Sequence, residues 1–388
     1  MSKVAIIHCD DYEYDKVRSA VNRGLELLGG VRQFARPGER ILIKPNLLAA
    51  DPPERCVTTH PAVFEAVAGA FLQHGVQLSY GDSPGFGGLN KAAQKSGLAT
   101  IAAKMGIETG NFEVGERLIF NEGIQNKSFV IAQAAARAQG IISLPKLKSH
   151  ALTTLTGAIK NQFGCIPGLL KGEYHAKLTE MKQFATMLVD LTGCLKPRLY
   201  VMDAIMAMEG NGPRNGKPRK IGALLFSSDP VAIDATAARM VGLLPDSLEM
   251  IRIGQQYGLG RMDKEALTLL GDALAPLVIT DFQLAHARTM ARLTNNRVRN
   301  AIVERPEIQE EKCIRCGICI QVCPAAPKAI QWTDEDEDGT PGGGKPPYYD
   351  YDRCIRCYCC QELCPEGAVI LRTPFLGQAF NRLKPPVI

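Results

Sequence analysis

The chain has 388 residues, of which 46% are hydrophobic and 22% are charged, and its formal net charge is +5 at pH 7. This composition indicates a globular protein of two or three domains. The modest charge allows an anionic ligand but is not typical of a nucleic-acid binder. No apolar run is long enough to span a membrane. We expect a cytoplasmic protein, whose thiols stay reduced.

Residues 1–278 alternate short apolar runs with amphipathic helical patterns. The run "VAIIHC" (4–9) precedes the helical pattern "YDKVRSAVNRGLELLGG", and "RILIKPNLL" is typical of a buried strand that ends in a turn. Later, "KIGALLFSSDPVAIDATAARMVG" predicts a strand, a cap at Ser228 or Asp229, and a helix. This alternation predicts an α/β body with a mainly parallel sheet, in one or two lobes.

Polar residues follow several of these predicted strands, and in α/β folds such residues gather at the carboxyl edge of the sheet. We expect an anionic substrate to be bound by Lys44, Asn46, Lys146, Lys148, Asn161 and Lys171. The candidate catalytic residues are Lys160, His150, His175 and Asp203. The alternatives are surface lysines, hydrogen-bonded structural histidines and helix-capping aspartates.

The remaining chain divides into three further segments. Residues 279–305 predict a basic helical linker, residues 306–373 a small α+β ferredoxin-like domain, and residues 374–388 a C-terminal tail. Nine of the thirteen cysteines lie between Cys313 and Cys364. In a reducing compartment, such clustering favours metal binding or catalysis over disulfides.

The cysteines form a repeated motif, C-x2-C-x2-C-x3-C-P, which is the spacing of bacterial ferredoxins. The first three cysteine thiolates of each motif bind one 4Fe-4S cluster, and the fourth cysteine of the motif binds the other cluster. Zinc sites with paired C-x2-C ligands do not explain this spacing. We therefore expect two 4Fe-4S clusters, one on Cys313, Cys316, Cys319 and Cys364, and one on Cys354, Cys357, Cys360 and Cys323.

Cys359 lies outside this register, either as a small packed residue or as a spare thiol. The segment "TDEDEDGTPGGGKPPYYDYD" between the motifs predicts an exposed loop, with a docking surface for a basic partner as the alternative. The glycines of "MEGNGPRNG" (209–216) match neither the Rossmann nor the P-loop pattern, so no nucleotide site is predicted there.

The succession "IKPNLL", "GDSPG", "LPKLKSH", "LTGAIKNQFGCIPGLLKGEYH", "MDAIMAMEGNGP" and "SSDPVAIDA" resembles the domain-of-unknown-function 362 family. The resemblance covers about residues 1 to 275. Members often carry a C-terminal pair of ferredoxin motifs, as this chain does. The resemblance implies an iron–sulfur protein with a redox role, but it implies no particular reaction.

Three functions remain open from the sequence. The first is a ferredoxin-type oxidoreductase that passes electrons from a soluble donor protein to an anionic small molecule. The second is a non-enzymatic electron-transfer or assembly protein whose α/β body docks a partner. The third is metal handling, in which His150, His175 and nearby carboxylates bind a second metal.

Overall fold

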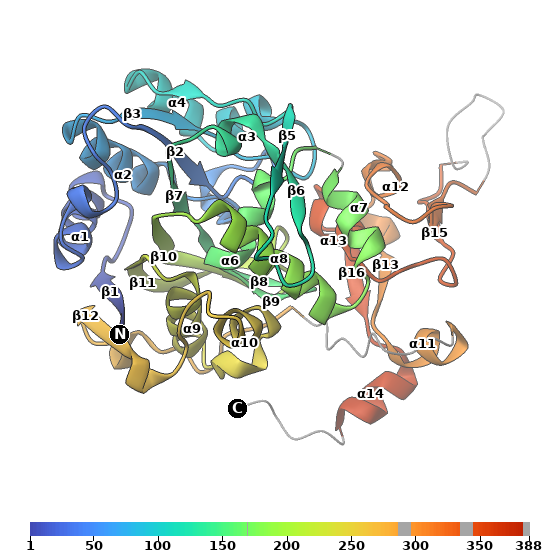
Figure 1. Cartoon of the computed structure of the whole chain (residues 1–388). Helices are drawn as coiled ribbons and strands as arrows, with labels where there is room; N and C mark the ends of the chain where they lie inside the picture. The colour runs from blue at the N-terminus through green and yellow to red at the C-terminus, as the bar shows by residue number, and fades with distance from the viewer. Residues whose placement is uncertain (169, 286–295, 334–343, 383–388) are drawn as a thin grey trace.

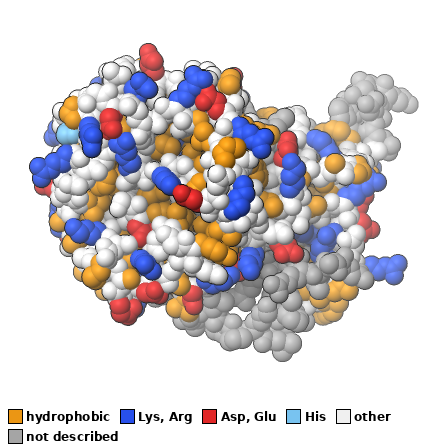
Figure 2. Space-filling view, in the orientation of Figure 1, with side chains coloured by type: hydrophobic (Ala, Val, Ile, Leu, Met, Phe, Trp, Pro, Cys, Tyr) orange, Lys and Arg blue, Asp and Glu red, His pale blue; other side chains and the backbone are white. Residues whose placement is uncertain are grey.

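A computed structural model describes residues 1–168, 170–285, 296–333 and 344–382 of the chain. A large body is built around one ten-stranded sheet, and a small module of short strands and helices lies beside it (Figure 1). Parts of the predicted linker, of the loop between the cysteine motifs and of the C-terminal tail fall outside the described residues. Lys, Arg, Asp and Glu side chains are interspersed on the face shown in Figure 2.

The main path of the sheet has the order β12-β1-β11-β10-β7-β2-β3-β4, with β8 beside β10 and β9 beside β8. β11 is antiparallel to both neighbours and β9 is antiparallel to β8, whereas the other pairs are parallel. This arrangement confirms the predicted α/β fold with a mainly parallel sheet. The strands are β1 Ser2–His8, β2 Arg40–Pro45, β3 Gln77–Tyr80, β4 Glu108–Thr109, β7 Gly140–Leu144, β8 Lys146–His150, β9 Thr154–Thr156, β10 Leu199–Glu209, β11 Lys217–Ser227 and β12 Leu267–Gly271.

Helices cover both faces of the sheet, so its strands are apolar on both sides. In β1, Val4 and Ile6 belong to the core that contains residues of α8, α9 and α10, whereas Ala5 and Ile7 belong to the core with α1, α2 and α4. The helices of the body are α1 Tyr14–Leu27, α2 Pro61–Gln73, α3 Leu89–Lys95, α4 Leu98–Lys104, α5 Gln133–Ala136, α6 Ala158–Asn161, α7 Leu170–Lys177, α8 Met181–Leu195, α9 Pro230–Met240 and α10 Glu249–Gln256. A hairpin of β5 (Gly115–Ile119) and β6 (Ser128–Ala132) stands apart from the large sheet.

Side chains at the predicted positions start two of these helices. Asp229 accepts hydrogen bonds from the N–H groups of Val231 and Ala232, and Pro230 is the first residue of α9. At the start of α2, His60 Nδ1 accepts from the N–H of Ala62. His60 therefore has the structural role that we expect for a single histidine.

The described parts of the predicted helical linker precede the small module. Residues 279–285 contain no helix, and α11 covers Asn296–Ile302. The module pairs β13 with β16 and β14 with β15, and it contains two short helices that carry cysteines. Its remaining elements are β13 Arg305–Ile308, α12 Ile318–Gln321, β14 Ile330–Gln331, β15 Tyr348–Tyr349, α13 Cys359–Leu363, β16 Val369–Arg372 and α14 Phe375–Arg382. Among the described helices, none is both long and apolar enough to cross a membrane.

Candidate active site between the two modules

A cavity of about 400 Å³ lies at the junction of the α/β body and the small module. The body contributes polar residues that follow strands at the carboxyl edge, and the module contributes residues from the end of its first cysteine motif and from its second motif. Its walls include His150, Lys160 and Lys171 from the body, and Cys323, Cys359 and Glu362 from the module. A ligand in this cavity would therefore contact both parts of the chain.

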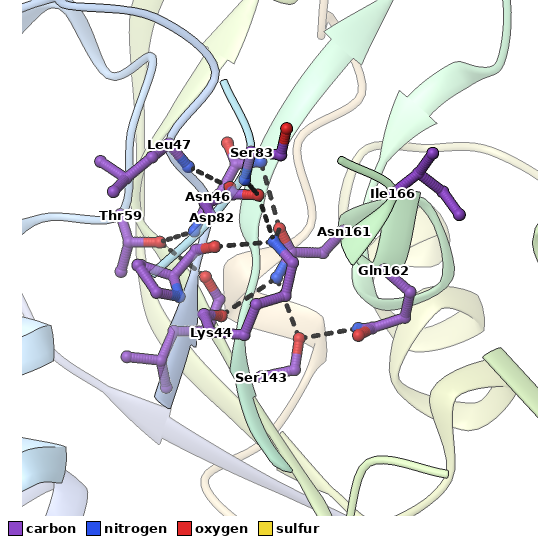
Figure 3. Close-up of polar contacts among 12 residues, drawn as sticks. Lys44, Asn46, Leu47, Thr59, Asp82, Ser83, Ser143, Asn161, Gln162 and Ile166 are labelled. Atoms are coloured by element: carbon purple, nitrogen blue, oxygen red, sulfur yellow. Dashed lines mark hydrogen bonds and ion pairs between the residues drawn. The ribbon is translucent and has the colours of Figure 1, made fainter. Parts of the chain in front are cut away.

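A buried ion pair supports one wall of the site, with Asp82 in the lining and Lys44 outside it. Lys44 is the penultimate residue of β2, and its Nζ lies 3.0 Å from Oδ1 of Asp82 in the loop after β3. Both side chains are almost fully buried, with exposed fractions of 0% and 4%. Asp82 also accepts hydrogen bonds from the N–H groups of Leu47 and Ser83 (Figure 3). Parallel strands and their loops thus hold this pair in place.

Asparagines connect this pair to the next lysine. Asn161 Oδ1 accepts from Lys44 Nζ and from Asn46 Nδ2, both at 3.2 Å (Figure 3). Asn46 Oδ1 in turn accepts from Lys148 Nζ at 2.7 Å. Burial, together with the neighbouring positive charges of Lys146 and Lys160, lowers the pKa of Lys148 to about 7. Burial also lowers the pKa of Lys171, to about 8.

The other end of the cavity brings together Lys160, His175, His150 and Glu362. Burial lowers the pKa of Lys160, and it lowers that of His175 to about 4. The pKa of His150 lies well below its usual value for the same reason. Both imidazoles are therefore neutral at pH 7. Burial raises the pKa of Glu362, whereas the nearby Lys160 lowers it.

Two of the predicted site residues lie elsewhere. Lys146 Nζ is 2.8 Å from Oδ2 of Asp203, and both bind the hydroxyl of Tyr12 at 2.7 Å. Tyr12 stacks on His60 at a centroid distance of 3.6 Å. Lys146 and Asp203 do not line the cavity. The structure thus separates them from the other candidate residues and places them in a buried network.

Helix α6, which carries Lys160 and Asn161, is held at its start by Asp234. The carboxylate accepts from the N–H of Ala158 at 2.6 Å and from that of Ile159 at 3.1 Å. A side chain at Gly157 would collide with this carboxylate, because a Cβ there would lie 2.2 Å from Oδ1. Asp234 therefore caps α6 rather than its own helix.

The glycine-containing loop 209–216 anchors the small module to the body. Arg214 pairs with Asp51 at 2.7 Å and donates to the backbone oxygen of Leu363 at 2.9 Å. Asn215 donates to the oxygen of Cys364, and Gln361 donates to Asn211 Oδ1 at 2.7 Å. These contacts hold α13 against the cavity, so the loop positions a wall of the site.

The eight motif cysteines surround two small cavities inside the module. Each cavity is lined by three cysteines of one motif and by the cysteine before proline of the other. The sets are Cys313, Cys316, Cys319 and Cys364, and Cys354, Cys357, Cys360 and Cys323. Within the described ranges, no three His, Cys, Asp or Glu side chains are arranged to hold a single metal ion. Thiols spaced around a cavity fit an iron–sulfur cluster better than one zinc ion.

Sequence reasoning missed two residues of these networks. Tyr12 lies in an unremarkable segment, and its contact with Asp203 joins positions 191 residues apart. Glu362 lies between two cysteines of the second motif, and the motif drew attention to the cysteines alone. Its position could have indicated a role in the site, because a carboxylate in a buried helix needs a partner or a function.

The fold and the cysteine arrangement define an iron–sulfur protein in which a 4Fe-4S module is joined to an α/β body. Residues 312–368 match the 4Fe-4S dicluster domain, and residues 41–239 match the domain of unknown function DUF362. The chain belongs to the DUF362 family, as its sequence motifs predict.

One relative and two solved structures are similar to this chain. A thylakoid-associated protein of Synechocystis is 34% identical over 260 residues, which cover 67% of this chain and 80% of the relative. A Thermotoga maritima protein shares 12% identity with a TM-score of 0.36, covering 58% of this chain and 57% of its own. The lactate racemase apoprotein of Thermoanaerobacterium thermosaccharolyticum shares 10% identity with a TM-score of 0.39, covering 59% and 55%. This chain therefore spans little more than half the length of either solved structure.

Proposed function

We propose that this protein is a reductase that passes electrons through two 4Fe-4S clusters to an anionic small molecule in the cavity between the modules. When bound, such clusters supply electrons one at a time. The eight cysteines around the two small cavities are the proposed ligands. The electron donor is a soluble one-electron carrier protein.

One observation carries this proposal: the large cavity is lined by cations of the body and by residues of both cysteine motifs. Cys323, a proposed cluster ligand, lies in its wall together with Cys359 and Glu362. A substrate held there is adjacent to the proposed second cluster. A docking domain for a partner protein would not need an internal cavity at this position.

The exposure of the two cysteine sets supports a direction for electron flow. Cys316 of the first set is exposed, and the neighbouring Ile314 is 60% exposed. In the second set, Cys354 and Cys360 are buried. The first cluster is therefore the entry point for electrons from a carrier, and the second cluster delivers them to the cavity.

Charges in the cavity favour an anionic substrate. The lysines there lose solvation by burial, and a bound anion restores favourable interactions to them. Because the pKa of Lys148 is about 7, its positive charge decreases as the pH rises through neutrality. We expect affinity for an anion to decrease over the same range.

A reoxidation experiment tests the proposal. Protein reduced anaerobically with dithionite is mixed with the low-molecular-mass fraction of a cell extract, and cluster absorbance is followed. The wild type is expected to reoxidise, and Lys160→Met about 10- to 100-fold more slowly, because a charged hydrogen bond contributes about 1.5–3 kcal/mol. The control Lys104→Met changes an exposed lysine that pairs with Glu65 and does not line the cavity.

Equal rates for wild type and Lys160→Met, with equal iron content, would overturn the reductase proposal. A protein that is reoxidised only by a macromolecular fraction would support the docking alternative instead. Iron and sulfide analysis of each variant separates loss of a cluster from loss of the substrate site.

A further inference from the structure

Most lysines in the wall of the cavity, and Lys44 next to it, already use their hydrogen bonds within the protein. A lysine ammonium has three N–H donors. The ammonium groups of Lys44 and Lys171 each have three acceptors within the protein, and that of Lys148 has two. The acceptors are Pro45 O, Asn161 Oδ1 and Asp82 Oδ1 for Lys44, Ser83 O, Ser83 Oγ and Ile166 O for Lys171, and Asn46 Oδ1 and Val57 O for Lys148. These three lysines primarily shape the cavity.

Lys160 differs from the others. Within the part of the chain that the structure describes, its ammonium has no hydrogen bond and no ion pair. Its Nζ lies over the rings of Phe163 and Phe184, 4.7 and 5.7 Å from their centroids. Such contacts stabilise a cation only modestly. All three N–H donors of Lys160 are therefore available to a ligand.

Glu362 faces the same end of the cavity, and His150 is its one close charged or polar neighbour among the described residues. Its side chain is 9% exposed, and Oε1 accepts no hydrogen bond from a described residue. His150 Nε2 is 3.2 Å from Oε1, but the two atoms do not have hydrogen-bond geometry. His150 Nδ1 is occupied, because it accepts from the N–H groups of Leu152 and Thr153.

The buried hydroxyl of Thr156 is a third unpaired group in this wall. Lys160 and Glu362 do not pair with each other within 4.0 Å, so a ligand group can lie between them. Buried polar groups without hydrogen bonds destabilise a protein, and more so when they are charged. Glu362 and Thr156 are two such groups, and the ammonium of Lys160 at the same end of the cavity has no hydrogen bond to a described residue, so a ligand bound there would complete the hydrogen bonds of all three.

We infer that this end of the cavity is a subsite for an amino acid-type zwitterion, whose carboxylate binds Lys160 and whose ammonium binds Glu362. Thr156 provides a hydroxyl to the same ligand. A ligand with only a carboxylate would pair Lys160 but leave Glu362 facing a second negative charge. The inference deepens the proposed function, because it assigns a substrate class to the same cavity.

Calorimetry on the anaerobic, cluster-loaded protein tests this subsite directly. The twenty standard amino acids are screened, and the tightest binder is compared with its deaminated and decarboxylated analogues. The wild type is expected to bind the amino acid at least about 10-fold more tightly than either analogue. Glu362→Gln should remove the advantage over the deaminated analogue, and Lys160→Met the advantage over the decarboxylated one.

Lys104→Met, at an exposed lysine that does not line the cavity, serves as the control and should preserve both advantages. If Glu362→Gln fails to keep its iron, the comparison of the three ligands on the wild type still decides the matter. Equal affinity for the amino acid and its deaminated analogue overturns the inference, and so does a failure of all twenty to bind. Neither result touches the proposed reductase, which the reoxidation rate of Lys160→Met tests separately.

Discussion

Lys44 and Asp82 form an ion pair of 3.0 Å in the interior of the protein, at the ends of two neighbouring parallel strands. The lysine is surrounded by three acceptors, and the carboxylate also binds two backbone N–H groups. Because both side chains are buried, solvent water cannot take the place of a lost partner. The pair therefore contributes to the structure of the cavity wall, and its loss leaves an isolated buried charge.

We predict that Lys44→Met lowers the free energy of unfolding by about 3–5 kcal/mol, because it leaves Asp82 unpaired. Denaturant unfolding under anaerobic conditions measures this change. The control Lys104→Met removes an exposed lysine from its ion pair with Glu65, and its effect should be below about 1 kcal/mol. Equal effects of the two substitutions would contradict the prediction.

Arg214 is predicted to hold the small module against the body. Arg214→Gln removes the ion pair with Asp51 and the hydrogen bond to the backbone oxygen of Leu363. We expect the free energy that holds the small module against the body to decrease by about 1.5–3 kcal/mol. Hydrogen exchange should then become faster in α13. Arg252→Gln, which affects a partly exposed pair with Glu249 on α10, should leave exchange in α13 unchanged. If hydrogen exchange in α13 is unchanged in Arg214→Gln, the prediction is wrong, and the other contacts of the loop hold the module in place.

Two adjacent cysteines should differ in their effect on iron content. Cys360 lines one of the small cavities, whereas Cys359 lines the large one. We predict that Cys360→Ser reduces the iron from about eight to about four atoms per chain, and that Cys359→Ser leaves it unchanged. Colorimetric iron analysis after anaerobic purification measures both variants. Loss of iron in Cys359→Ser would make Cys359 a ligand and change the proposed assignment.

Asp234 should make stability dependent on pH. Burial raises its pKa to about 7, whereas the carboxylate of an unfolded chain titrates near about 4. Between these values the folded protein retains a proton that the unfolded chain has released. The free energy of unfolding should therefore fall as the pH rises from about 4 to about 7.

The comparison with Asp234→Asn isolates this contribution. Between about pH 5 and pH 8, the stability of the wild type relative to this variant should decrease. The exposed Asp246→Asn should give a curve parallel to the wild type. A parallel curve for Asp234→Asn would show that Asp234 does not titrate in this range.

The sequence predicted the sheet because its strands are buried on both faces and appear as short continuous apolar runs. It did not predict that β11 runs antiparallel to its neighbours, because strand direction depends on the path of the connections. The sequence also placed Lys44, Lys148 and Lys160 at the carboxyl edge of the sheet. Which lysine is left unpaired depends on side chains such as Asp82 and Asn46, whose proximity exists only in the folded chain.

The division of the cavity wall between the body and α13 has a consequence for attempts to divide the protein. In the proposed reductase, separate expression of the ferredoxin module would remove the electron supply from the cavity, and separate expression of the body would leave the cavity without Glu362. A single cut between the two parts would then disrupt both proposed roles, substrate recognition and electron supply. In this architecture, the fusion of the two parts is itself a condition for a complete binding site.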